Sequence, residues 1–192
     1  MTPGINSLKL PALAGNQMQF TESAMAIIES LLGVKTAGLP EKYTGECKLL
    51  LHELFTNAIN HSGSRDVEFL FLLENDHIRI DMVTEGPGFK IKPVNPDCTP
   101  GDSVYDPPYH GLEGSSFILH LDVDFEVVCR VEGTAELTLF SRPRETEMTD
   151  RKNSIPEHFG LLIITRLGSG VSYRKNADGK NIFSLKRPLP TY

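Results

Sequence analysis

The residues best suited to chemistry lie in one short segment, residues 53–61, which reads Glu-Leu-Phe-Thr-Asn-Ala-Ile-Asn-His. On a helix, at about 100° per residue, Glu53, Asn57 and Asn60 share one edge beside an apolar stripe. A carboxylate can take a proton from a hydroxyl or from water. A carboxamide oxygen one turn away can bind Mg²⁺, which prefers oxygen ligands. The segment therefore predicts a polar helix edge that faces a cleft, with a solvated polar face as the alternative.

Zinc chemistry is excluded at this segment. His52 and Glu53 begin an HExxH pattern, but the second His would have to stand at position 56, which is Thr56. Two His residues at i and i+4 are what put both nitrogens on one face of a helix. The three cysteines are widely spaced and form no CxxC pair, so reduced, partly buried thiols are expected rather than a metal site or disulfides. They are Cys47, Cys98 and Cys129.

Hydrophobic periodicity predicts the elements that would position the polar edge. They are a strand over 5–13, helices over 18–32 and 41–61, and two hairpin strands over 67–73 and 77–83. The helical stripe beside the edge is apolar and consists of Cys47, Leu51, Leu54 and Ala58. In the last strand apolar and polar residues alternate, which predicts that one face is buried against the helices.

A glycine-containing turn follows that strand. Gly86 and Gly88 come directly after Thr84, and two glycines two positions apart let a backbone turn sharply and approach a ligand closely. The following Gly- and Pro-rich loop ends at about residue 110. Loops of this length are more often functional lids than plain connections.

After the lid, an αββ pattern is predicted twice, over 110–143 and over 158–188, with a polar linker between the copies. Each copy reads as a glycine-led helix, a strand, a turn and a strand. Gly111 and Gly114 begin the first of these helices, and backbone N–H groups at such a helix start suit a phosphate. Chance similarity is the alternative to a true repeat.

The composition excludes several classes of protein. The chain has 192 residues, of which 40% are apolar and 23% charged, as in an average globular domain. Its net charge is −6, from 19 Lys and Arg against 25 Asp and Glu, and such a chain with no basic cluster is a poor candidate for binding nucleic acid. No apolar run approaches a membrane span, and no signal peptide is visible. A cytoplasmic protein is therefore expected.

The order of these motifs resembles the GHKL (Bergerat-fold) ATP-binding superfamily, and most closely the bacterial anti-sigma factors that are also serine protein kinases. Residues 53–61 are similar to the family's N box, residues 84–89 to its G1 box, and residues 111–121 to its G2 box. The resemblance covers residues 5–141. It implies a two-layer α/β (α+β) sandwich, in which helices cover one face of a mixed, mostly antiparallel sheet. It also implies ATP and Mg²⁺ beneath a flexible lid at about residues 84–110.

The resemblance assigns a role to each matching residue. Glu53 would be the general base that deprotonates a serine, and Asn57 would be the Mg²⁺ ligand. The other nucleotide-binding residues would be Asn60 and His61 of the N box, Gly86 and Gly88 at the adenine pocket, Gly111 and Gly114 at the phosphates, and Thr134 near adenine.

Two positions depart from the family pattern. The G1 box usually opens with an Asp that accepts a hydrogen bond from the adenine amino group, and here that position is Thr84, with Asp81 as the competing acceptor. The G2 box usually reads Gly-x-Gly-Leu, and the glycines of residues 111–121 are displaced by one position. The second αββ copy, around Gly160, is the other candidate for the phosphate loop. The distance from the G1 box favours the first copy.

These observations predict a nucleotide-binding domain over 1–141, followed over 142–192 by a linker and an appended αββ unit. The expected function is that of an ATP-binding regulatory protein of the anti-sigma factor and serine kinase type. By resemblance, its partners would be an anti-anti-sigma protein of the STAS type and a sigma factor, and it would form a homodimer. The alternative is a docking module of the same fold that has lost nucleotide binding. The ATPase domain of a split histidine kinase is disfavoured, because no phospho-acceptor helix is visible upstream.

Overall fold

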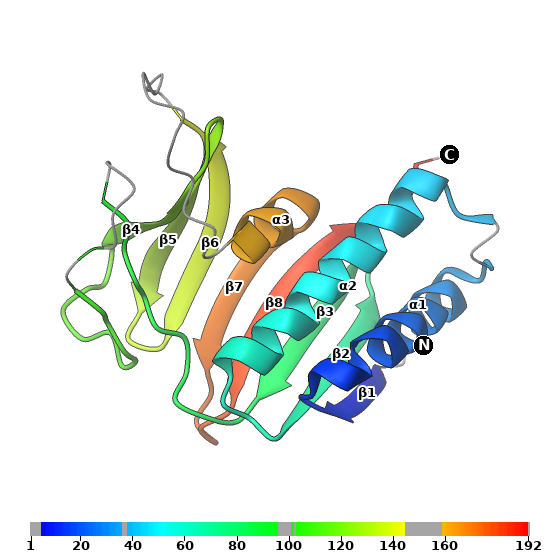
Figure 1. Ribbon diagram of the computed structural model, residues 1–192, viewed down its shortest axis with the longest axis horizontal. Helices are drawn as coiled ribbons and strands as arrows, with labels where there is room; N and C mark the ends of the chain where they lie inside the picture. Colours follow the sequence, from blue (N-terminus) through cyan, green and yellow to red (C-terminus); the bar gives the residue numbers. More distant parts are fainter. Residues whose placement is uncertain (1–4, 36–37, 96–100, 102, 145–158, 192) are drawn as a thin grey trace.

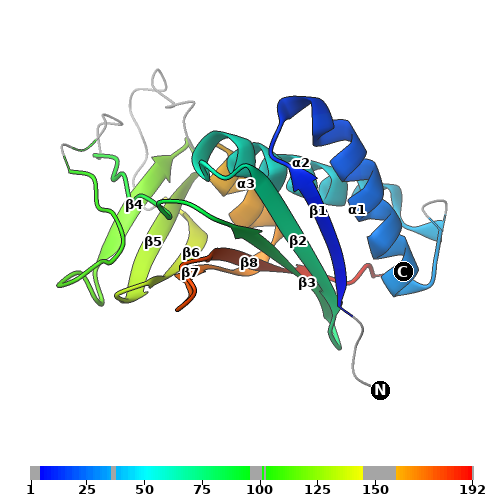
Figure 2. The same cartoon turned by 90° about the horizontal axis from the view of Figure 1, so that it is seen from below.

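The computed structural model describes residues 5–35, 38–95, 101, 103–144 and 159–191. In these ranges three α-helices pack on one face of an eight-stranded antiparallel sheet, so the architecture is α+β in two layers (Figure 1). Figure 2 shows the helices on the same side of the sheet. Within the described ranges, no helix is both long enough and apolar enough to cross a membrane.

The order of strands across the sheet differs from their order in the chain. The helices are α1 (Gln17–Leu32), α2 (Glu41–His61) and α3 (Phe159–Leu167), with a 3-10 turn η1 (Ala14–Asn16). The strands are β1 (Asn6–Pro11), β2 (Asp66–Leu73), β3 (His77–Thr84), β4 (Ser116–Leu121), β5 (Phe125–Gly133), β6 (Glu136–Pro143), β7 (Ser169–Lys175) and β8 (Asn181–Pro188). Their order in the sheet is β1-β2-β3-β8-β7-β6-β5-β4. The C-terminal hairpin β7–β8 therefore lies in the middle.

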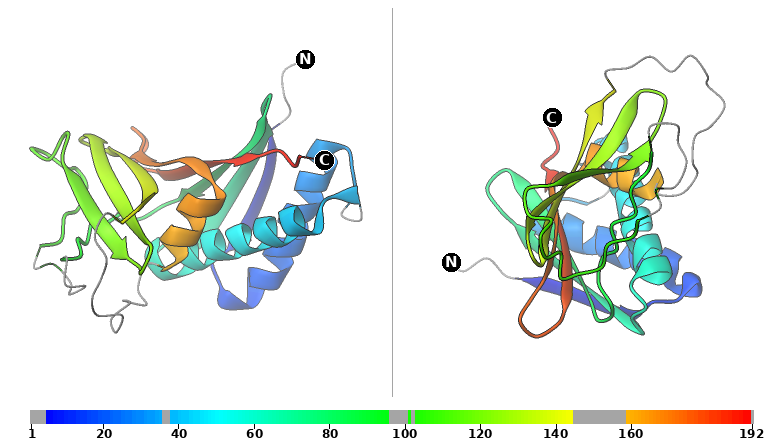
Figure 3. Two further views of the ribbon diagram at one scale, coloured as in Figure 1. Left: turned by 90° about the horizontal axis from the view of Figure 1, so that it is seen from above. Right: turned by 90° about the vertical axis from the view of Figure 1, so that its left-hand side faces the viewer.

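The first half of the chain folds as its periodicity predicts. α2 has the predicted bounds, α1 begins one residue earlier than predicted, and β2 and β3 form the expected hairpin. The C-terminus of α1 is capped by Gly33 in the left-handed region, at φ 67°, where glycine carries no Cβ penalty. Figure 3 shows α1 and α2 side by side over the sheet.

The core lies between the helices and the sheet. The apolar stripe of α2 is buried along its whole length, as predicted, and an aromatic cluster joins α1, α2 and β2. In this cluster the ring of Phe20 lies 4.7 Å from that of Phe55 and 4.4 Å from that of Phe69, measured between centroids. Cys47 and Cys129 are buried free thiols, and burial raises the pKa of both, that of Cys129 to about 12. Cys98 lies outside the described residues.

The helix predicted at the start of the first αββ copy is wrong. Residues 111–115 form turns, and residues 116–121 form strand β4, which pairs with β5. The run Phe-Ile-Leu-His-Leu is a short apolar segment, and periodicity alone does not separate a buried strand from a buried helix at that length. The first copy is therefore three strands, and only the second copy is αββ.

The C-terminal unit is not an appendage, which corrects the predicted boundary at residue 141. β8 pairs with β3 along its whole length, from His77 opposite Pro188 to Thr84 opposite Asn181, and β7 pairs with β6. The pairings are antiparallel throughout the described sheet, where a mixed sheet was expected. The described residues between β3 and α3 thus form an insertion in the chain between the paired strands β3 and β8, and strands β4–β6 of this insertion extend one edge of the sheet. Residues 96–100 and 102 of the expected lid, and residues 145–158, lie outside the described ranges.

A buried arginine ties α2 and α3 to the sheet. Arg187 on β8 is 8% exposed, and its guanidinium donates to Glu46 Oε2 on α2 at 2.6 Å and to the carbonyl of Leu167 at the end of α3 at 2.8 Å. The same guanidinium lies over the ring of Tyr43, 4.7 Å from its centroid. A buried cation is tolerated when it is paired and hydrogen-bonded. Arg187 therefore fixes where α3 ends relative to α2.

Removing residues 144–192 is expected to abolish cooperative folding. β3 and β6 would each lose a paired strand, and the core would lose α3, so unpaired strand edges and apolar surface would both be exposed. Circular dichroism and urea unfolding of the truncated chain measure this effect. Removal of residues 191–192 alone, which follow the last strand, is the control and should leave the urea midpoint unchanged. A sharp unfolding transition in the long truncation would show that β1–β6 form a domain of their own.

Candidate functional site

An apolar pocket lies between α2, the end of β3, the start of α3 and the hairpin β7–β8. Its walls are mainly hydrophobic or aromatic side chains: Leu54, Met82, Phe89, Leu161, Tyr173 and Phe183. The other lining residues are two lysines, Lys90 and Lys92, and a set of other polar side chains with one glycine: Asn57, His61, Ser62, Thr84, Gly88 and Asn181. Pockets of this kind, apolar with a few polar groups, are typical of small-molecule sites.

The charge of the pocket is opposite to that of the whole chain. Lys90 and Lys92 line it, and none of the described residues in its lining is an Asp or a Glu, although the chain carries a net charge of −6. Lys90 lies 3.2 Å from Asp106, but both side chains are exposed, so this ion pair is weak and open to exchange. A cationic, apolar pocket suits a ligand that has both an anionic group and a flat apolar part.

The polar edge of α2 meets the start of α3 beside this pocket. A Cβ atom added to Gly160 would lie 2.7 Å from Glu53 Oε2, which is closer than van der Waals contact allows. It would lie 3.6 Å from Asn57 Oδ1, which is ordinary contact. A glycine therefore allows the first turn of α3 to approach the carboxylate and the carboxamide. The next residue, Leu161, enters the pocket wall. A helix start favours negative charge, so Glu53 and an anionic ligand are both stabilised there.

A hydrogen-bond network holds the glycine turn after β3 against the C-terminal hairpin. The carbonyl of Gly86 accepts from Asn181 Nδ2 and from Lys175 Nζ, each at 3.3 Å, and Asn181 Oδ1 accepts from the hydroxyl of Tyr173 at 2.8 Å. Burial raises the pKa of Tyr173, so the phenol keeps the proton that it donates. Thr84 stands opposite Asn181 in the sheet, and the network therefore fixes the polar end of the pocket.

Four of the residues predicted from the sequence line one pocket: Asn57, His61, Thr84 and Gly88. Two more lie at its border, since Glu53 adjoins Gly160 and Gly86 anchors the turn. The expected juxtaposition of the helix edge and the glycine turn is thus present in the structure. Asn60 is exposed and is not part of the lining.

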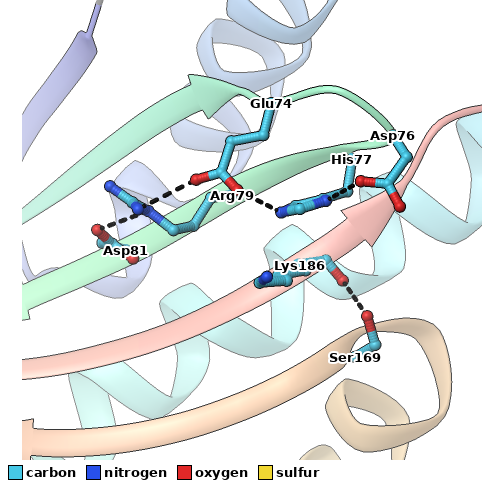
Figure 4. A network of polar contacts seen from close by, with 7 residues as sticks. All are labelled: Glu74, Asp76, His77, Arg79, Asp81, Ser169 and Lys186. Carbon is cyan, nitrogen blue, oxygen red and sulfur yellow. Dashed lines mark hydrogen bonds and ion pairs between the residues drawn. The ribbon is translucent and has the colours of Figure 1, made fainter.

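Asp81 lies on the other face of the sheet, away from the pocket. It alternates with the buried side chains of β3, and its Oδ2 is 3.4 Å from Arg79 Nε (Figure 4). In the same surface network His77 lies between Asp76 and Glu74, with nitrogen–oxygen distances of 2.6 and 2.7 Å. The hydrogen bond from His77 lowers the pKa of Asp76. Asp81 is therefore not the acceptor that a shifted register would have brought into the pocket.

The glycines of the first copy are also outside the pocket. Gly111 and Gly114 are exposed in the turns before β4, and a Cβ at either would have no atom within 4 Å. Thr134 is exposed in the β5–β6 turn, where its carbonyl accepts from Tyr109 N at 2.7 Å. The glycine that lies beside Glu53 and Asn57 is instead Gly160, which belongs to the second copy. Distance along the chain from residues 84–89 does not reflect proximity in space here, because strands β4–β6 come between these residues and Gly160 in the chain.

Four residues of the pocket lining were not predicted from the sequence: Lys90, Lys92, Tyr173 and Asn181. Lys90 and Lys92 alternate with Ile91 directly after the glycine turn, which is the available signal for two cations on one side of an extended segment. Tyr173 and Asn181 come from β7 and β8, and no local pattern brings these strands beside β3. Comparison with known proteins adds no candidate: no family model matches the chain, and no curated protein matches it significantly.

Gly86→Ala is expected to destabilise the fold strongly. Gly86 has φ 133°, and a Cβ there would collide with the carbonyl oxygen of Ser62, so steric overlap with backbone adds to conformational strain. The expected loss in free energy of unfolding is about 3 kcal/mol or more. Gly111→Ala is the matched control, because Gly111 also has a positive φ, 76°, but free space around it. The control should lose only about 1–2 kcal/mol in the same urea titration. Equal losses would contradict the packed turn.

Proposed function

We propose that this chain is an ATP-binding regulatory protein with a Bergerat-type core, of the anti-sigma factor and serine kinase type. The observation that carries the proposal is the meeting of Glu53 and Asn57 on α2 with Gly160 on α3, beside an apolar pocket that has lysines and no carboxylate in its described lining. The element order supports the core assignment, because β1, α1, α2, β2 and β3 are followed, after the insertion, by α3, β7 and β8.

The pocket fits the two parts of a nucleotide. Its apolar wall, with the rings of Phe89 and Tyr173 at 5.7 Å between centroids, suits a planar base. Lys90 and Lys92 supply positive charge for phosphates, and the glycine start of α3 supplies backbone N–H groups without side-chain obstruction. Both parts of such a ligand are thus matched by groups of the right chemistry.

Asn57 would hold Mg²⁺ through its carboxamide oxygen, and the ion when bound would neutralise phosphate charge. Among the described residues, no three His, Cys, Asp or Glu side chains gather to hold a metal by themselves. The ion would therefore depend on phosphate oxygens and water for its other ligands, as Mg²⁺ commonly does. The oxygen donors beside Gly160 fit this requirement.

Glu53 would act as the general base toward a serine of a small partner protein, here an anti-anti-sigma protein of the STAS type. The serine oxygen would attack the γ-phosphorus while the bond to the bridging oxygen breaks. ADP leaves with that electron pair, and the hydroxyl proton passes to Glu53. Leu49, one turn before Glu53, and Phe159, next to Gly160, are 43% and 52% exposed. Exposed apolar side chains beside the carboxylate suit the docking of a partner, and a sigma factor is the second partner proposed.

Asn57→Ala is expected to weaken ATP binding about tenfold in the presence of Mg²⁺ and no more than about threefold in its absence, because the lost oxygen serves the metal. Isothermal titration calorimetry with and without MgCl₂ measures both values. Asn60→Ala is the matched control, since it removes an exposed carboxamide from the same helix and should change neither value. No saturable ATP binding by the parent chain would refute nucleotide binding and favour the docking module.

Glu53→Gln is expected to slow phosphoryl transfer by about 10²–10⁴-fold, because it removes the base and keeps the shape. ATP affinity should stay within a few-fold of the parent value. Transfer of labelled phosphate from ATP to candidate partner proteins measures the rate. Glu41→Gln, at the exposed start of the same helix, controls for the loss of one charge. Transfer at the parental rate by the Glu53→Gln variant would remove Glu53 from this role.

A further inference from the structure

We propose that the pocket binds purine nucleoside triphosphates without distinguishing a 6-amino from a 6-oxo group, so that it accepts inosine nucleotides as readily as adenosine ones. This inference rests on the proposed function and concerns the part of the pocket that would meet the edge of the base. It follows from which polar groups the pocket offers there, and from which of them are already engaged.

Thr84 is the residue that decides which group at the 6-position of a purine the pocket accepts. It is 5% exposed, it is the last residue of β3, and it shares the helix-facing side of that strand with Met82. A threonine hydroxyl donates one hydrogen bond and also accepts, and the hydroxyl hydrogen rotates to suit its partner. It can therefore accept from an amino group or donate to a carbonyl oxygen.

Two other polar side chains of the lining, Asn181 and Ser62, are held in one orientation by hydrogen bonds. Asn181 gives its amide nitrogen to Gly86 and its amide oxygen to Tyr173. The hydroxyl of Ser62 donates to the carbonyl of Ala58 at 2.6 Å and accepts from a backbone N–H at 3.0 Å. These bonds fix both side chains: Ser62 has no hydrogen left to donate, and Asn181 keeps one N–H and one oxygen lone pair, so it offers a donor and an acceptor together.

A carboxylate in place of the hydroxyl would distinguish the 6-amino group from the 6-oxo group. An ionised carboxylate only accepts, so it binds a 6-amino group and repels a 6-oxo group. The carboxylate of β3, that of Asp81, is on the far face of the sheet beside Arg79. No Asp or Glu occurs in the described lining of the pocket. The base is therefore held by apolar contact and by a hydroxyl that adapts to it.

The test is calorimetric titration of the full chain with ATP, ITP and UTP in excess MgCl₂. ITP differs from ATP at the 6-position in carrying an oxo group, and UTP keeps the phosphates but lacks the purine. The dissociation constants for ATP and ITP should agree within about fivefold, and UTP should bind at least about tenfold more weakly than either.

Two variants test the role of Thr84. Thr84→Asp should bind ATP at least about tenfold more tightly than ITP, because the new carboxylate only accepts. Thr84→Val, which keeps the shape without the hydroxyl, should weaken ATP and ITP equally. If Thr84→Asp fails to fold, the ratio of the dissociation constants for ATP and ITP, measured in the parent chain and in Thr84→Val, still tests the inference.

The outcomes separate this inference from the proposed function. ATP binding at least about tenfold tighter than ITP would overturn the inference and leave ATP binding intact. Equal binding of UTP would overturn it as well, since the phosphates alone would then be recognised. Absence of binding by all three nucleotides would refute the proposed function and the inference with it. Similar constants for ATP and ITP, with weak UTP, support the inference.

Discussion

The antiparallel pairing of β3 with β8 is the constraint on which the site depends. It joins segments from the two halves of the chain, and it sets Thr84 opposite Asn181 at one end of the ladder. The same ladder sets Arg187 opposite Ile78 near its other end, where the guanidinium holds both α2 and the last turn of α3. One run of backbone hydrogen bonds therefore fixes both the polar end of the pocket and the helix that forms its wall.

Helix α3 links the pairing of β3 and β8 to the positions of Glu53, Asn57 and Gly160. α3 is short, and Arg187 fixes its C-terminal end through the carbonyl of Leu167. Because a helix is stiff, fixing that end also sets the position of Gly160 at the other end, against Glu53 and Asn57. The absence of a side chain at Gly160 then allows the helices to approach closely. The polar edge of α2 meets α3 because of a distant buried cation as well as local sequence.

The sequence predicts the local features well and the distant ones poorly, for a physical reason. The bounds of α2 and the faces of β3 follow from periodicity within a single segment, and that periodicity is enough to find Asn57 and Thr84. The pairing of β3 with β8 joins segments that are far apart in the chain, and no local sequence pattern predicts such a pairing. Local reasoning therefore favours the first copy over Gly160, and it predicts a helix where β4 lies. It misses Tyr173 and Asn181 for the same reason.

The insertion between β3 and α3 is joined to the sheet as well as to the site. Its first residues carry the two lysines and the ring of Phe89 against Tyr173, while its strand β6 pairs with β7. Tyr173 thus lies on a strand that is bonded on one side to the inserted strands and on the other side to β8. A ligand that moves the Phe89 segment would act on a strand shared with the core. The described part of the insertion is therefore connected to the pocket through β7, because β6 pairs with β7 and Tyr173 on β7 lines the pocket.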